Sequence, residues 1–357
     1  MNERRARVVL LLLAAAGLVA AIAGGLARLG VGAALPSAAF HGAVMVCGFL
    51  GTVISLERAV ALRAGWAYLA PAAAGLGTVA LLLGGYSVAA ALWLMAPIAL
   101  LVASAAIVRR QRAAHTVLLA VAAVAWLAGS LAHAFGRHDA APAWWFAFLV
   151  LTIGAERLEM TRLMRRRPLA TPLLAGIVTA LLLACAVAMI DAAIGRALYG
   201  LSLAALAAWL AAFDIARRTV RTEGFARYSA FALLCGYAWL AVAGFAWAFA
   251  SAGRDVALHA LGLGFVFSMI LGHAPLIVPV VAGVRMRYMS AFYLPLALLH
   301  ASLVLRLLAG HSAMDLRVWG ALGNTVAIGL FMATLAFSIA TRERRVSCPN
   351  RGRAPKP

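Results

Sequence analysis

The stretch HGAVMVCGFLGTVISLERAVAL, from His41 to Leu62, is apolar along most of its length and is charged only at Glu57 and Arg58. About 20 such residues cross a bilayer as one helix, and a charged end is typical of a membrane span. Runs of this kind fill the chain. We predict twelve spanning helices, at residues 8–27, 38–62, 66–84, 86–108, 115–135, 142–163, 171–190, 195–216, 226–250, 255–283, 288–309 and 315–341.

The composition excludes other classes of protein. Of the 357 residues, 65% are hydrophobic and 12% are charged, and the mean hydropathy is +0.98. So few polar residues cannot cover a water-facing surface, which excludes a soluble enzyme, a secreted disulfide scaffold and a disordered regulator. The expected fold class is all-α: a polytopic membrane protein with one transmembrane domain over residues 1–341 and a basic, disordered cytoplasmic tail over residues 342–357.

The net charge of +20 is explained by topology rather than by nucleic-acid binding. The basic residues do not form a patch on a soluble domain but gather in alternate connections between the apolar runs. If the N-terminus is cytoplasmic, the outer half keeps only Arg28, Arg137, Arg196, Arg254, Arg306 and Arg317 of the 31 basic residues. This asymmetry predicts both termini in the cytoplasm of a bacterial inner membrane, with membrane lipid and no nucleic acid as partner.

Two histidines are expected at similar depth. His41 lies near the start of the span at 38–62 and His259 near the start of the span at 255–283, and both spans run from the outside inward. Matching depth on two helices is what bis-imidazole ligation of one haem iron requires. Met45 and Gly48 share a face with His41, and Gly262 shares one with His259. The glycines would leave room for a porphyrin edge, but they would equally serve close helix packing.

Two segments carry a family resemblance. HGAVMVCGF (residues 41–49) and LHALGLGFVFSMILGHAPLIVP (residues 258–279) resemble the helix 2 and helix 10 signatures of haem-copper oxidase subunit I, and more closely the NnrS-like membrane haem proteins linked to nitric oxide metabolism. The motif residues are His41, Met45, Gly48, Phe49, His259, Ala260, Gly272 and His273. The resemblance implies a twelve-helix bundle with pseudo-threefold arrangement, in which His41 and His259 hold a haem b.

The sequence departs from the oxidases at the second metal centre. The resemblance implies histidines on helices 6 and 7, but the spans at 142–163 and 171–190 contain none. We therefore expect electron transfer or nitric oxide handling without a complete binuclear centre, with a quinol or a cytochrome as possible electron donor and no assigned catalytic residue. Copper could bind at His133 and His300 if their helices meet, although hydrogen-bonded or lipid-boundary histidines are the simpler interpretation.

A second pattern lies in the inner halves of the spans. GTVISLERAVALR (residues 51–63) and LTIGAERLEMTR (residues 151–162) share a threonine, a Glu-Arg pair and a later arginine, as in a repeat four helices apart. His273 lies at the corresponding depth of the span at 255–283. The predicted inner polar cluster consists of Glu57, Arg58, Glu156, Arg157, Glu159 and His273. It forms either interfacial ion pairs or an entry for protons or a quinol head group.

Two other function classes remain open. A multi-helix transporter is disfavoured because the charged residues cluster at one end of the spans, and because the repeat does not divide the chain into two inverted halves. A non-catalytic scaffold or assembly factor for a respiratory complex would co-purify with its partners. Both alternatives predict a colourless protein, whereas a haem protein is coloured.

Overall fold

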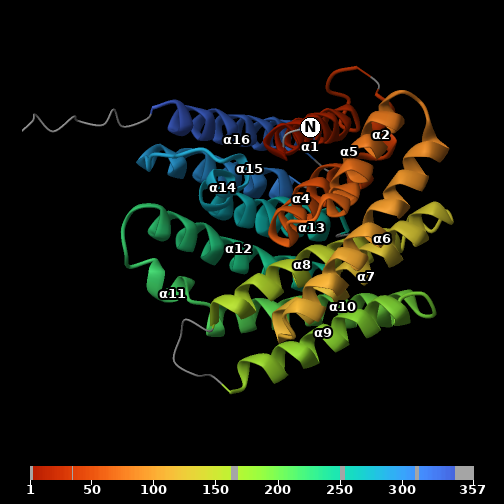
Figure 1. Cartoon of the computed structure of the whole chain (residues 1–357). Coiled ribbons are helices and arrows are strands. Elements are labelled where there is room, and N and C mark those ends of the chain that lie inside the picture. The colour runs from red at the N-terminus through yellow and green to blue at the C-terminus, as the bar shows by residue number, and fades with distance from the viewer. Residues whose placement is uncertain (1–2, 34, 162–167, 250–253, 310–312, 342–357) are drawn as a thin grey trace, which may run out of the picture.

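The computed structural model describes residues 3–33, 35–161, 168–249, 254–309 and 313–341, and these are folded into helices and short connections without a β-strand (Figure 1). The predicted tail at 342–357 lies outside the described residues. The helices are α1 Glu3–Ala27, α2 Pro36–Ala39, α3 His41–Ala43, η1 Val44–Leu50, α4 Gly51–Leu62, η2 Gly65–Tyr68, α5 Leu69–Leu82, α6 Tyr86–Arg110, α7 Ala114–Ala134, α8 Ala141–Met160, α9 Ala170–Val187, α10 Ala192–Phe213, α11 Ala216–Thr219, α12 Gly224–Phe249, α13 Arg254–His259, η4 Ala260–Val266, α14 Phe267–Ala282, η5 Ser290–Phe292, α15 Tyr293–Ala309 and α16 Met314–Ala340.

The all-α part of the prediction is confirmed, and the helices are compatible with a multi-pass membrane protein. Within the described residues, 11 helical segments are long and apolar enough to cross a membrane, and each matches a predicted span to within a few residues. The remaining predicted span, at 142–163, corresponds to α8, which is not among the 11. Its end carries Glu156, Arg157 and Glu159, which lower its hydropathy.

Helix α8 lies inside the helical body. It packs against α7, α9, α10 and η4, and most of its residues from Trp145 to Ala155 are buried (Figure 1). The first and last long helices, α1 and α16, also contact each other. At the charged end of α8, the side chains of Arg157 and Glu156 are 11% and 23% exposed, whereas that of Glu159 is 46% exposed.

Two segments are π-helical rather than α-helical. Segment η1 begins three residues after His41, and η4 begins directly after His259. Each segment contains a glycine carbonyl that accepts a hydrogen bond from a side chain four residues later. Thr52 donates to the Gly48 carbonyl and Ser268 donates to the Gly264 carbonyl, both at 2.5 Å. Because π-helical turns are rare and occur frequently at functional sites, they mark the two histidines independently of the sequence motifs.

Small residues let α10 and α12 cross closely. A Cβ on Gly244 would lie 2.7 Å from the Gly200 carbonyl oxygen, and a Cβ on Gly200 would meet the Gly244 carbonyl in turn. This reciprocal contact is the small-residue packing that holds membrane helices together. It fixes α12 beside α10, and so brings the residues after α10 close to α12.

Candidate functional site

His41 is held by helix α1. Its Nδ1 lies 2.6 Å from the carbonyl oxygen of Ala21, and its ring lies against Gly25, where an added Cβ would be 2.9 Å from the ring Cε1. Because a carbonyl oxygen can only accept, Nδ1 carries the proton and Nε2 carries the lone pair. This leaves Nε2 as the nitrogen available to a ligand.

His259 has the same tautomer. Its Nδ1 is 2.8 Å from the backbone carbonyl oxygen of Asp255 and 3.2 Å from the Asp255 carboxylate, while its Nε2 is 3.1 Å from a guanidinium nitrogen of Arg306. The guanidinium can only donate, so Nε2 again carries the lone pair. His41 lies within electrostatic range of both His259 and Arg306.

Asp255 connects three helices around His259. Its carboxylate forms an ion pair with Arg317 of α16 at 2.9 Å and faces Arg306 of α15 at 3.9 Å. The side chains of Arg306 and Arg317 are 9% and 11% exposed, so these charges are largely removed from water. We call His41, Asp255, His259, Arg306 and Arg317 the histidine site.

The three predicted neighbours of these histidines differ in their surroundings. A Cβ on Gly48 would collide with the Thr78 hydroxyl of α5, so Gly48 is a packing contact. Gly262 is looser, since an added Cβ would lie 3.6 Å from the nearest ring atom of Phe146. Met45 is half-buried in η1. The available room near a histidine is therefore at Gly262 rather than at Gly48.

His133 and His300 each have a partner of their own. The Nδ1 atoms of His133 and His138 lie 3.0 Å apart, and Trp239 donates from its ring nitrogen to His300 Nδ1 at 3.0 Å. The described residues contain no group of three or more His, Cys, Asp or Glu side chains arranged to hold a metal ion. His133 is thus placed beside His138, and His300 beside an indole.

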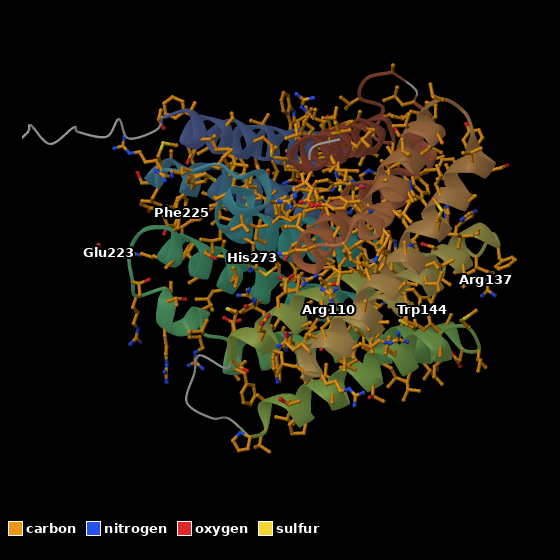
Figure 2. All side chains as sticks on the ribbon, in the orientation of Figure 1. Arg110, Arg137, Trp144, Glu223, Phe225 and His273 are labelled. Carbon is orange, nitrogen blue, oxygen red and sulfur yellow. The ribbon has the colours of Figure 1, made fainter. Side chains whose placement is uncertain are left out.

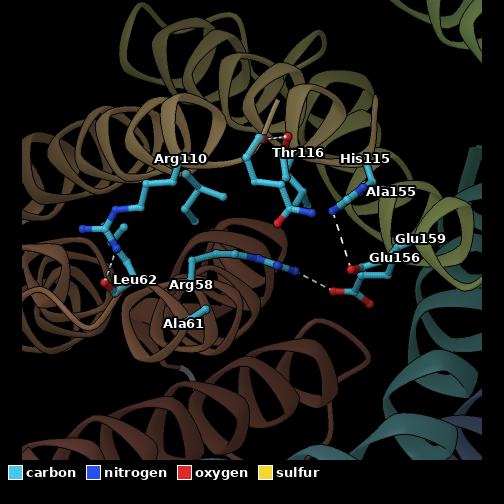
Figure 3. A pocket seen from close by; sticks show the side chains of 12 residues that line it. Arg58, Ala61, Leu62, Arg110, His115, Thr116, Ala155, Glu156 and Glu159 are labelled. Atoms are coloured by element: carbon cyan, nitrogen blue, oxygen red, sulfur yellow. Dashed lines mark hydrogen bonds and ion pairs between the residues drawn. The ribbon is translucent and has the colours of Figure 1, made fainter. Parts of the chain in front are cut away.

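The predicted inner polar cluster is divided between two places. In the first, Arg58 of α4 pairs with Glu156 of α8 at 2.7 Å (Figure 3). Arg58 also faces Glu57 at 3.7 Å. His115 Nε2 lies 3.6 Å from the carboxylate of Glu159 nearby. A partly open cavity of about 270 Å³ lies between these groups, and we call it the charged cavity.

The second place holds Arg157 and His273. The Nε of Arg157 is 3.8 Å from Asp214 Oδ2, and His273 Nδ1 donates to the Met269 carbonyl at 2.7 Å. His273 also lies within electrostatic range of Arg157. The two neighbouring residues Glu156 and Arg157 therefore point to different helices, Glu156 to α4 and Arg157 to the α10–α11 connection.

Comparisons with known proteins give a family and no activity. A family model described as a domain of unknown function, DUF8744, matches residues 7–340. The chain belongs to this family. No curated protein and no solved structure matches it. The DUF8744 domain extends from α1 to α16, so the histidine site, the charged cavity and Asp214 all lie within it.

Sequence reasoning missed several side chains at these sites. Asp255 had a usable signal, because a carboxylate four residues before a histidine shares its helix face. Asp214 had a weaker one, as a single acid at the end of an apolar run. The roles of Arg306 and Tyr237 depend on which helices meet, and a single sequence does not contain this information.

Proposed function

We propose that this DUF8744 protein is a membrane haem-binding protein in which His41 and His259 ligate one haem b. The observation that supports the proposal best is the shared tautomer of the two rings, each with Nδ1 bound to a backbone carbonyl and Nε2 carrying the lone pair. Iron binds an imidazole lone pair, and a hydrogen bond from the other ring nitrogen orients the ring and strengthens the ligand.

Two features of the surroundings also support the proposal. Gly262 leaves room near His259, and Arg306 has a buried Nε without a hydrogen-bond partner among the described residues. A guanidinium is the group best suited to a carboxylate, and haem carries two. On ligand binding, Arg306 would give up its contact with His259 Nε2 and keep its attraction to Asp255.

A haem b held by both histidines would supply reversible one-electron chemistry. The role we propose is accordingly electron transfer or nitric oxide handling, without a complete binuclear centre. The protein's own residues would set the position of the ligand: α1 holds His41 through Ala21, and Asp255 holds His259 while its charge is balanced by Arg306 and Arg317.

The proposed fold is a twelve-span bundle of the oxidase type, with α8 as the remaining span and with α4, α8 and α14 as equivalents. The pairing of Arg58 with Glu156 supports a contact between α4 and α8. The electrostatic interaction of Arg157 with His273 supports a contact between α8 and α14. We place the protein in a bacterial inner membrane with both termini in the cytoplasm, as the distribution of arginines predicts.

The test is a reduced-minus-oxidised optical spectrum of the detergent-purified protein, with iron and copper analysis of the same sample. We expect a sharp low-spin haem band, about one iron per chain, and loss or high-spin conversion of the band in His41→Ala and His259→Ala. His138→Ala and His300→Ala are matched controls that should keep it. A colourless protein that binds no added haem would refute the proposal.

A transporter is the second candidate, and the charged cavity is the observation in its favour. Two arginines, two glutamates and a histidine line it, namely Arg58, Arg110, Glu156, Glu159 and His115. Such a lining suits a small polar solute. This candidate predicts a colourless protein in which Arg58→Met abolishes uptake of a polar solute into vesicles and leaves the spectrum unchanged.

A further inference from the structure

Among the buried polar atoms that lack a hydrogen-bond partner within the described residues, four come from four different segments that meet at one end of α8. They are Arg157 Nε in α8, Asp214 Oδ2 between α10 and α11, Tyr237 OH in α12 and His273 Nε2 in α14. Figure 2 labels His273 near the centre of the view. Asp214 is 0% exposed and Tyr237 is 3% exposed, so bulk water does not reach either side chain directly.

The four side chains lie together. Arg157 Nε is 3.8 Å from Asp214 Oδ2, and Tyr237 interacts electrostatically with both Asp214 and Arg157. His273 lies within electrostatic range of Arg157. We call Arg157, Asp214, Tyr237 and His273 the Asp214 cluster.

The hydrogen-bonding capacities of the cluster match one another but are not used directly. Arg157 Nε–H and the Tyr237 hydroxyl are donors, while Asp214 Oδ2 and His273 Nε2 are acceptors, since His273 Nδ1 already donates to Met269. A separation of 3.8 Å exceeds the length of a hydrogen bond. Leaving a buried polar atom without a partner is unfavourable, so such a group of four calls for a bridging species.

Water fits this site better than an organic ligand. A water molecule donates twice and accepts twice, so it can bridge acceptors and donors that stand too far apart to meet. Asp214 Oδ1 is already occupied by the backbone N–H of Ala216 at 2.6 Å, which leaves Oδ2 as the oxygen that faces the cluster. An organic head group would need an open path, and Asp214 is fully buried.

We propose that the Asp214 cluster is a hydrated proton-binding site, in which ordered water joins the four side chains and the Asp214 carboxyl takes up and releases one proton. On uptake, an O–H bond of the bridging water breaks as an O–H bond forms at Asp214 Oδ2, and that water takes a replacement proton from the bulk. On release, the same bond breaks and the proton passes to the bridging water, leaving the carboxylate.

The charges around Asp214 suit this exchange. Burial raises the pKa of Asp214, and the guanidinium of Arg157 opposes that rise. Tyr237 from α12 and the Ala216 N–H also favour the carboxylate, while neutral His273 contributes an acceptor. The protonated and deprotonated forms of Asp214 are therefore closer in free energy than burial alone would allow.

Infrared difference spectroscopy of the full-length purified protein tests this proposal. A pH step should reveal a carboxylic-acid C=O band that shifts in D₂O and disappears in Asp214→Asn. Asp191→Asn is the matched control, because Asp191 is an exposed helix cap. Arg157→Met should move the titration midpoint upward, because the carboxylate loses its cation.

Tyr237→Phe keeps the test informative if Asp214→Asn does not fold, since it should shift the same band by removing one donor to the bridging water. Absence of a titrating band that depends on Asp214, or a band that ignores D₂O, would overturn the proposal. The optical spectrum of the same sample separates this result from the haem question, because Asp214→Asn should leave any haem band intact.

Discussion

Asp255 shows how much one carboxylate can organise in an apolar protein. Its carboxylate contacts His259 of its own helix, α13, and lies within ion-pair distance of Arg306 of α15 and Arg317 of α16. Its side chain is 30% exposed, so water screens part of these interactions.

We expect Asp255→Asn to lower the free energy of unfolding by about 1–3 kcal/mol, because it leaves two largely buried guanidinium groups without their counter-charge. Thermal unfolding in detergent measures this. Asp139→Asn is the control, since the pair with Arg137 is exposed and should contribute less than about 1 kcal/mol. Equal losses in the two variants would contradict the assignment.

Asp214 should give the protein a distinctive pH dependence. Burial raises its pKa in the folded chain, so the folded chain keeps this proton to a higher pH than the unfolded chain does. The resulting stabilisation is complete below the unfolded pKa and is lost as pH rises through the folded pKa. Melting temperatures across a pH series should therefore fall with pH more steeply than those of Asp214→Asn. Superimposable profiles would contradict this.

At the residue scale, the sequence was most informative where a residue type is rare. His41 and His259 stood out because few polar groups occur in spans, and the structure places a π-helical segment beside each. Whether they bind haem stays a prediction. The partners of Arg157 could not be predicted, because Glu156 and Arg157 are adjacent in sequence and turn toward different helices.

At the scale of the helix, the sequence predicts where segments begin and end better than whether they are α-helical or π-helical. The predicted span at 38–62 is divided into α2, α3, η1 and α4, and the span at 255–283 into α13, η4 and α14. A π-helix differs from an α-helix in its period, and the period is read from alternating polar and apolar faces. Residues 44–50 and 260–266 are apolar throughout, so they contain no alternation from which a period could be read.

The α10–α12 crossing gives a prediction about packing. Gly244→Val should destabilise the protein by about 1–3 kcal/mol or more, because the new Cβ would press on the backbone of α10, which cannot move aside. Gly176→Ala is the control: nothing lies within 4 Å of the added Cβ, and alanine favours the helix by about 0.5–1 kcal/mol. Thermal unfolding of both variants distinguishes crowding from a general intolerance of glycine substitution.

At the scale of the whole molecule, the arginine distribution predicts an orientation. Figure 2 places Arg137 and Glu223 at opposite ends of the helical body, as expected of connections on opposite sides of a membrane. Reporter fusions after Arg112 and Arg221 should therefore report the cytoplasm, and a fusion at Gly136 should report the outside. A reversed pattern at two of these sites would overturn the topology.

Hydropathy alone distinguishes 11 spans within the described residues, because the charges of α8 count against it. In the folded protein these charges have partners on other helices, so the cost of burying them is partly offset by contacts that no single segment reveals. Segment hydropathy and tertiary pairing thus disagree most where α8 meets the charged cavity.

The two π-helical segments also have a consequence for how this family can change over time. A π-helical turn accommodates one residue more than an α-helical turn, so a chain that loses one residue between positions 44 and 50, or between 260 and 266, would return to regular winding with the flanking faces still inward. Single-residue gaps in related sequences should collect at these two places and be absent from the other long helices. Loss of a residue there would change the position of His41 or His259 without interrupting the membrane helix that carries it.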